Sequence, residues 1–175
     1  MATERREIAV VGGGLAGTAT ALAFAAAGFD TVLIAPKSAP DGRSTALLGD
    51  SVAFLSSLGV MDRLGPKAAP LAVMRLIDDT KRLFRAPVVE FRASEIGLAS
   101  FGYNVLNADL QAALSEGIAD APKLEVRETA ARGFKIEGDR AVVALEDGGS
   151  YCVDLVVAAD GRRSPMREAA GIGVR

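Results

Sequence analysis

The chain of 175 residues contains no histidine and no tryptophan, and its only cysteine is Cys152. The absence of histidine excludes histidine-based metal sites and the Ser-His-Asp and Cys-His arrangements of nucleophilic catalysis. A single cysteine cannot form an internal disulfide bond, which is consistent with a reducing, cytoplasmic compartment. Cys152 follows Tyr151 in a strand-like run, so we expect it to be a small buried apolar residue.

Strong charge of either sign is also missing. The 20 Lys and Arg residues nearly balance the 22 Asp and Glu residues, and the sequence contains no basic stripe, which argues against nucleic acid as a partner. Half of the residues are apolar, which indicates a globular chain with one good core. The charge-free run over residues 8–29 resembles a signal peptide or a membrane span. We reject both, because three consecutive glycines from Gly12 would weaken a spanning helix.

The same run contains the most informative motif of the chain. Residues 8–11 are an apolar run typical of a buried parallel strand, and an alanine-rich helix is expected over residues 18–27. Between them lies a G-x-G-x-x-G loop, in which Gly12 permits a sharp turn, Gly14 lets a pyrophosphate approach the backbone and Gly17 lets the helix lie close to the strand. Free N–H groups at the helix start would then bind the phosphates. This order favours a dinucleotide site; the alternative is a glycine-rich turn without a ligand.

The remaining patterns predict an α/β fold. Residues 31–35 read as a second parallel strand, residues 45–58 as an amphipathic helix, residues 107–118 as a helix and residues 155–159 as a buried strand that returns to the parallel sheet before a helix at 166–170. The other predicted strands cover residues 71–77, 82–85, 88–91, 123–127, 131–136, 141–145 and 150–153. The last four fit a β-meander. Residues 71–103 read as antiparallel strands inserted into a Rossmann-like domain formed by residues 1–70 and 104–175.

Four segments resemble the aromatic-ring flavoprotein monooxygenases, which share the p-hydroxybenzoate hydroxylase fold, and more narrowly their ubiquinone-biosynthesis branch. The segments are Gly12-x-Gly14-x-x-Gly17, residues 42–47 (GRSTAL), residues 101–110 (FGYNVLNADL) and residues 159–167 (ADGRRSPMR). The last resembles the family's D-G motif, which is more specific than the glycine loop. The resemblance implies a Rossmann-like FAD-binding domain that carries part of an antiparallel substrate-domain sheet.

The resemblance also implies roles for individual residues. The glycine loop, with Leu15 and Ala16, would hold the FAD pyrophosphate. Arg43 would lie near the flavin or its phosphates, unless it is a solvated loop charge. Asn107 occupies the place where the family often has an arginine or glutamine that contacts the cofactor, and its alternative role is a helix cap. Asp160, followed by Gly161, would lie near the FAD and the approach of the nicotinamide, and its alternative role is a turn and cap residue. No catalytic side chain or metal ligand is predicted.

Two departures from the family pattern bear on cofactor binding. The fold usually places an acid at the end of the second strand to hold the adenosine ribose, but this chain has Ala35 there, followed by Pro36, and the nearest acid after it is Asp41 in the loop. Either the ribose is held differently or its binding is weakened. The family's second flavin motif, G-D, lies well beyond residue 175. The chain therefore corresponds to roughly the first half of such an enzyme, and we expect self-association or a complementing C-terminal half.

The family implies an FAD-dependent monooxygenase that uses NAD(P)H and O₂ to hydroxylate a small aromatic substrate. For the ubiquinone branch the substrate is a prenylated phenol, which implies a cytoplasmic enzyme with peripheral membrane contact. Three alternatives stay open: another flavoprotein oxidoreductase such as a prenyl reductase or halogenase, a non-catalytic nucleotide-binding fragment or subunit, and an NAD-dependent dehydrogenase. The inserted strands, the D-G motif and Ala35 speak against the dehydrogenase.

Overall fold

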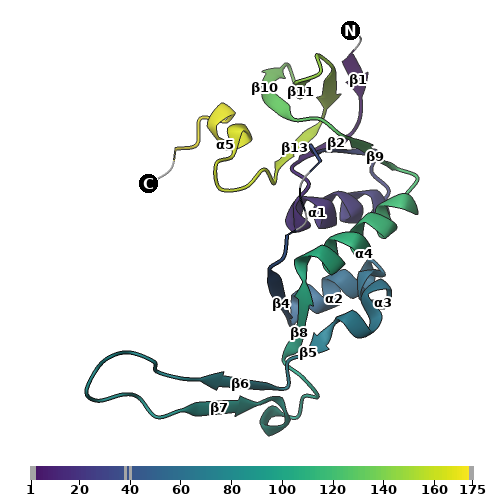
Figure 1. The fold of residues 1–175 in the computed structure, drawn as a ribbon. Coiled ribbons are helices and arrows are strands. Elements are labelled where there is room, and N and C mark those ends of the chain that lie inside the picture. Colours follow the sequence, from purple (N-terminus) through teal and green to yellow (C-terminus); the bar gives the residue numbers. More distant parts are fainter. Residues whose placement is uncertain (1–2, 38, 40, 174–175) are drawn as a thin grey trace. The chain divides into compact units, whose positions relative to one another are not determined.

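The computed structural model describes residues 3–37, 39 and 41–173. The described chain divides into two compact units, one formed by residues 1–41 and 110–175 and the other by residues 42–109. We call them the nucleotide unit and the insert unit (Figure 1). The boundaries of the Rossmann-like domain and of the substrate-domain strands drawn from the sequence stay predictions.

A parallel sheet lies at the centre of the nucleotide unit. Its strands, in the order β13-β2-β3-β9, are β13 (Leu155–Ala158), β2 (Ile8–Val11), β3 (Thr31–Ile34) and β9 (Leu124–Arg127). All neighbours run parallel, so the four carboxyl ends meet at one edge of the sheet. The strands β2 and β3 are buried along their whole length, as their unbroken apolar runs predict. The edge strand β13 is only half-buried, which corrects the expectation of a buried strand.

The second sheet of this unit is mainly an antiparallel meander. It has the order β1-β12-β11-β10, with β1 (Thr3–Arg5), β12 (Ser150–Val153), β11 (Arg140–Leu145) and β10 (Ala131–Glu137). The expected meander is thus confirmed for β10, β11 and β12 but was wrong for residues 123–127, which form β9 of the parallel sheet. Cys152, expected to be buried, is half-buried.

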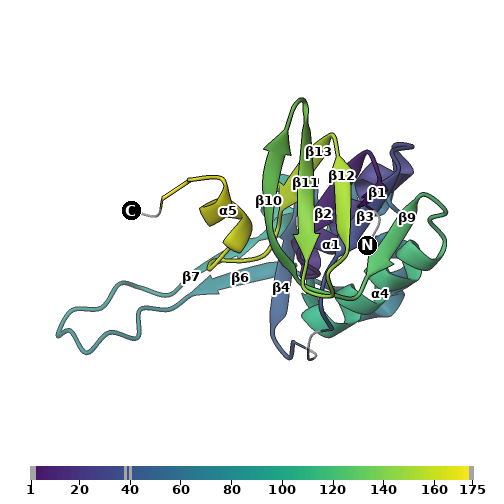
Figure 2. The ribbon, with the colours of Figure 1, turned by 90° about the horizontal axis from the view of Figure 1, so that it is seen from above.

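The nucleotide unit has three layers, because the parallel sheet buries both faces (Figure 2). Ala9, Val11, Val32 and Ile34 pack against the meander, which contributes Tyr151 among others. Alternate residues of β2 and β3 face helix α1 (Leu15–Ala26) and the part of α4 (Asn107–Ala119) that begins at Leu110. The helix α5 (Pro165–Ala169) follows β13 and adds Met166 to the core on the meander side.

A partly buried polar cluster joins the meander to β9. Tyr151 is 1% exposed and donates a hydrogen bond of 2.7 Å to Glu125, which also accepts one of 2.5 Å from Arg6. Burial and the contact with Glu125 raise the pKa of Tyr151 well above its usual range, so the phenol stays protonated and keeps donating. These hydrogen bonds hold β9 against the meander. The residues that follow β9 are therefore held in place as well.

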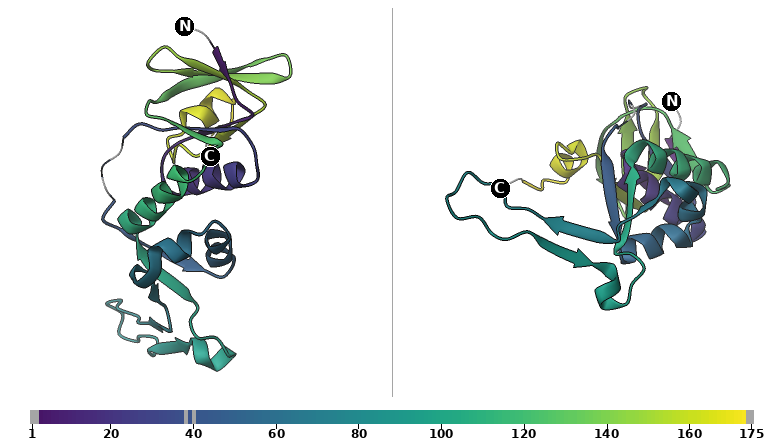
Figure 3. Two further views of the ribbon diagram at one scale, coloured as in Figure 1. Left: turned by 90° about the vertical axis from the view of Figure 1, so that its right-hand side faces the viewer. Right: turned by 60° about the horizontal axis from the view of Figure 1, so that its bottom comes forward.

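The insert unit contains a three-stranded antiparallel sheet of order β4-β8-β5 and a separate hairpin, β6–β7 (Figure 3). The sheet strands are β4 (Ser44–Leu48), β8 (Gly102–Leu106) and β5 (Ala69–Pro70), and the hairpin strands are β6 (Val73–Leu76) and β7 (Val89–Arg92). The short helices are α2 (Asp50–Ser57), α3 (Val60–Leu64), η1 (Gly65–Lys67) and η2 (Ala93–Ile96).

Two predictions for this unit need correction. Residues 45–58 do not form one helix, because β4 takes the first part and pairs with β8, and the helix begins only at Asp50. Residues 82–85 do not form a strand but belong to the irregular loop between β6 and β7. The expected antiparallel pairing across residues 71–103 is confirmed by the hairpin.

Candidate functional site

The glycine loop joins the carboxyl end of β2 to the start of α1, and two of its glycines are packed against protein. Gly12 has φ +116°, and a Cβ there would collide with the carbonyl oxygen of Ala159, which follows β13. A Cβ on Gly17 would collide with the carbonyl oxygen of Gly12. These close approaches explain why the turn and the strand–helix contact require glycine.

Gly14 differs from both, because its missing side chain leaves open space. A Cβ at Gly14 would meet no atom within 4 Å, and the backbone (φ −71°, ψ 174°) is extended and open to any residue. Helix α1 begins directly after it, with no side-chain cap and no acidic residue in its first turn. The first N–H groups of a helix have no partner inside the helix, so those of α1, including Leu15 and Ala16, are suited to bind a phosphate.

A cavity of about 470 Å³ lies beside this loop at the carboxyl edge of the parallel sheet. It is lined by the following residues: Val11, Gly12, Gly13, Gly14, Ile34, Pro36, Ala130, Ala131, Ala159, Asp160, Gly161 and Pro165. Gly12 and Gly14 of the glycine loop and Asp160 and Gly161 of the D-G motif therefore line one cavity, although some 145 residues separate the two motifs in the sequence, whereas Leu15, Ala16 and Gly17 are not among its lining residues. We call it the loop cavity.

Among the described residues that line the loop cavity, Asp160 alone has an ionisable side chain. Its Oδ2 accepts a hydrogen bond of 3.0 Å from the backbone N–H of Met166, so half of the carboxylate caps α5. Its Oδ1 is buried and has no hydrogen-bond partner among the residues that the structure describes. A buried carboxylate oxygen without a donor is costly, and a ligand hydroxyl group would relieve that cost. The cap alternative and a cofactor role are thus compatible.

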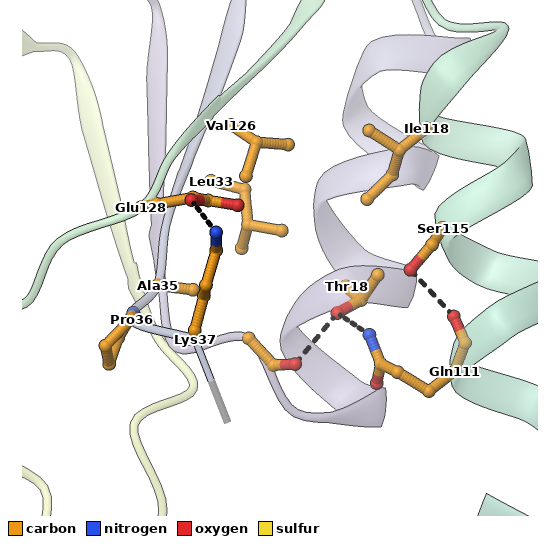
Figure 4. A pocket seen from close by; sticks show the side chains of 11 residues that line it. Thr18, Leu33, Ala35, Pro36, Lys37, Gln111, Ser115, Ile118, Val126 and Glu128 are labelled. Atoms are coloured by element: carbon orange, nitrogen blue, oxygen red, sulfur yellow. Dashed lines mark hydrogen bonds and ion pairs between the residues drawn. The ribbon is translucent and has the colours of Figure 1, made fainter. Parts of the chain in front are cut away.

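A second cavity of about 390 Å³ adjoins the first at Gly13 and Pro36, and Figure 4 shows its side chains. On one wall, Gln111 of α4 donates a hydrogen bond of 3.1 Å to the hydroxyl of Thr18, which donates one of 3.2 Å to the carbonyl of Gly13. At the opposite wall, Lys37 and Glu128 form an ion pair of 3.0 Å. We call it the α4 cavity.

Arg43 and Asn107 lie next to each other in the insert unit. The backbone N–H of Asn107 donates a hydrogen bond of 2.8 Å to the carbonyl of Arg43, and its side-chain oxygen accepts one of 2.5 Å from Thr45. Asn107 is 7% exposed and is the first residue of α4, whereas Arg43 is exposed. The two residues that the resemblance pairs with the cofactor are thus close to one another, and their contact with it stays a prediction.

Sequence reasoning missed several residues of the two cavities. Thr18 and Gln111 are 93 positions apart in the sequence, and their hydrogen bond supports the glycine loop. No local sequence pattern indicates such a contact. Glu128 could have been found, because it directly follows a strand, as the expected ribose acid does. Because that strand was predicted to lie in the meander, Glu128 was not recognised as a neighbour of Ala35.

Residues 5–175 match the family model of the FAD-binding domain. The chain belongs to this family. Among curated proteins, it is 34% identical to the 3-demethoxyubiquinol 3-hydroxylase of Escherichia coli, with 99% of this chain and 46% of that protein covered. It is 32% identical to the ubiquinone hydroxylase UbiL of Rhodospirillum rubrum, with 97% and 40% covered. The chain thus spans less than half the length of either relative.

Solved structures show the same fold. The p-nitrophenol 4-monooxygenase PnpA of Pseudomonas putida superposes with a TM-score of 0.82 at 22% identity, covering 97% of this chain and 44% of that one. The flavin-dependent monooxygenase PieE, solved with FAD and substrate, gives a TM-score of 0.77 at 23% identity over 97% and 33% of the two chains. The fold class and the family resemblance predicted from the sequence are confirmed.

Proposed function

We propose that this chain is the FAD-binding part of an aromatic monooxygenase. The observation that carries the proposal is the open space at Gly14, which faces the uncapped start of α1 and adjoins the cavity that contains Asp160. A glycine loop packed tightly all round would be a structural turn. A loop tight at Gly12 and Gly17 but open at Gly14 supports the proposal that it cradles a phosphate.

Bound FAD would supply the transfer of electrons from NAD(P)H to O₂ and of one oxygen atom to the aromatic ring. The balance is one NAD(P)H, one O₂, one proton and one aromatic C–H giving NAD(P)⁺, water and one phenolic C–O–H. The described residues would bind and orient the cofactor: the loop holds phosphate, the N–H groups of α1 neutralise its charge, and Asp160 accepts a hydroxyl hydrogen bond. None of them is proposed to move a proton in the reaction.

The names of the two curated relatives favour a prenylated phenol of the ubiquinone type as substrate. The chain, loaded with FAD and combined with a C-terminal half like that of the relatives, should oxidise NAD(P)H faster when such a phenol is added, and the product should carry one oxygen atom from ¹⁸O₂. Reduction of a substrate double bond without oxygen insertion would favour a prenyl reductase, and halide-dependent product a halogenase. Bound FAD without any NAD(P)H oxidation would favour the non-catalytic subunit.

We further propose that the loop between β6 and β7 contacts the membrane where such a substrate resides. Leu83 and Phe84 are 92% and 87% exposed, and Lys81, Arg82 and Arg85 flank them. Asp78 holds the base of this loop by accepting hydrogen bonds of 3.0 Å from the N–H groups of Thr80 and Ala86, which lower its pKa. Adjacent apolar side chains flanked by cations fit an anionic lipid surface. No helix within the described residues is both long and apolar enough to cross a bilayer.

The double substitution Leu83→Ser/Phe84→Ser should reduce binding to vesicles that contain phosphatidylglycerol by about 100-fold, since each apolar side chain contributes roughly 1.5–3 kcal/mol on burial. Co-sedimentation measures the partition coefficient. Ile136→Ser is the matched control, because Ile136 is 67% exposed but lies in the nucleotide unit. Equal loss in both variants, or no vesicle binding by the unchanged chain, would refute this contact.

The hairpin also favours a complementing segment. Its large apolar residues are exposed on both strands, among them Met74, Leu76 and Phe91 at 42%, 61% and 45%. A two-stranded hairpin without a covered face is marginal in water. We propose that further strands, from a C-terminal half like that of the relatives or from a second copy, extend this sheet. Sedimentation velocity with and without such a segment would measure the association.

A further inference from the structure

The position that usually holds the adenosine ribose lacks a polar side chain in this chain. Residue 35, at the end of β3, is an alanine whose side chain faces the glycine loop: a Cβ on Gly13 would lie 2.6 Å from the Cβ of Ala35. The usual residue here is an acid that accepts hydrogen bonds from the ribose hydroxyl groups. The loop thus fits the phosphates, whereas residue 35 cannot bind the sugar.

The neighbouring strand places a carboxylate beside this gap. Ile34 pairs with Arg127 in the parallel register, and the N–H of Ala35 donates a hydrogen bond of 3.0 Å to the carbonyl of Arg127. Glu128 is therefore the residue that directly follows β9, beside Ala35, which directly follows β3. Neighbouring strands lie about 4.8 Å apart, a span that the longer glutamate side chain can bridge.

Glu128 and Lys37 both line the α4 cavity, together with Gly13 and Ala35 (Figure 4). Their side chains are 57% and 80% exposed, so their ion pair of 3.0 Å faces solvent. Exposed ion pairs contribute little to stability, which leaves the carboxylate free to accept from a ligand while Lys37 still donates to it. The α4 cavity adjoins the loop cavity, and Gly13 and Pro36 line both.

We propose that Glu128, held by Lys37, replaces the missing acid and binds the adenosine ribose of FAD. The inference rests on the proposed binding of FAD. A carboxylate accepts from the 2′- and 3′-hydroxyl groups of a ribose and repels a 2′-phosphate. Without that carboxylate, Lys37 is released and becomes a partner for a 2′-phosphate. Glu128 thus selects against nucleotides phosphorylated at the 2′ position.

The test compares ADP, 2′-deoxy-ADP and 2′-phospho-ADP by calorimetry. Glu128→Gln should weaken the binding of ADP and FAD about 10-fold and the binding of 2′-deoxy-ADP by a smaller factor. It should strengthen the binding of 2′-phospho-ADP. Adding Lys37→Met should abolish the strengthening. Glu116→Gln, which removes one exposed carboxylate from α4, is the matched control and should change none of these affinities.

If Glu128 had only a structural role, Glu128→Gln would change the affinities for the three nucleotides by the same factor. That result would overturn the inference, as would unchanged affinities in Glu128→Gln. Both outcomes leave the proposed function intact as long as the unchanged chain binds FAD. Failure of the unchanged chain to bind either ADP or FAD would refute the proposed function itself. Thermal unfolding of each variant confirms that the fold is retained.

Discussion

Gly14→Ala is expected to leave the fold intact and to weaken FAD binding by about 100-fold or more, equivalent to roughly 2.7 kcal/mol. The backbone at Gly14 suits alanine and its Cβ would touch no protein atom, so stability should hardly change. The same Cβ would occupy the space in which the pyrophosphate approaches the start of α1. Quenching of FAD fluorescence measures the affinity, and thermal unfolding measures the stability.

Gly17→Ala is the matched control, because it adds the same methyl group three residues later. There the Cβ would collide with the carbonyl oxygen of Gly12 and lie 3.1 Å from the Cβ of Ala159. We expect it to destabilise the chain by about 1–3 kcal/mol or more, so that any loss of FAD follows the loss of fold. If Gly14→Ala bound FAD as tightly as the unchanged chain, the phosphate would not lie at this loop.

Asp160→Asn should weaken FAD binding by about 10- to 100-fold, since hydrogen bonds to charged groups are worth roughly 1.5–3 kcal/mol. The amide oxygen can still accept from the N–H of Met166, so the cap of α5 is kept. The substitution replaces the buried Oδ1, which has no partner within the described chain, by a neutral NH2 group, so it removes the charge and keeps a polar atom at that place. The stability of the cofactor-free protein should therefore change little, whereas the affinity for FAD falls.

Ser164→Ala separates the cap from the cofactor contact. The hydroxyl of Ser164 accepts a hydrogen bond of 2.9 Å from the N–H of Arg167, and its loss should cost about 1 kcal/mol of stability without a direct effect on FAD. If Asp160→Asn instead lost stability and kept its FAD affinity, Asp160 would be a turn and cap residue only. Both variants can be measured in the same fluorescence and unfolding assays.

Elements defined by local signals could be predicted from the sequence. The glycine loop, β2 and α1 are adjacent in the chain, and the periodicity of each element is distinct. Partners distant in sequence could not be predicted. Residues 45–48 suit a helix or a strand, and their pairing with β8, more than fifty residues later, decides for the strand.

The parallel position of β9 was hidden for a related reason. A four-residue strand of alternating apolar and charged residues does not specify its neighbour, and residues 124–127 pair with β3, not with the strands that follow them. The neighbouring strand determines which residues lie near the end of β9. Glu128 lies beside Ala35 only because β9 pairs with β3 in the parallel sheet. The loop cavity depends on the contact between β2 and β13, which the sequence separates widely, and so does the placement of Asp160 beside the glycine loop.

Titration of the purified chain with FAD, followed by desalting and a visible spectrum, tests the central claim most directly. The account predicts saturable binding of one FAD per chain, with flavin absorbance that survives desalting in the unchanged protein and is lost in Gly14→Ala. A chain that unfolds cooperatively but stays colourless and does not quench FAD fluorescence would contradict the claim that these residues hold the cofactor.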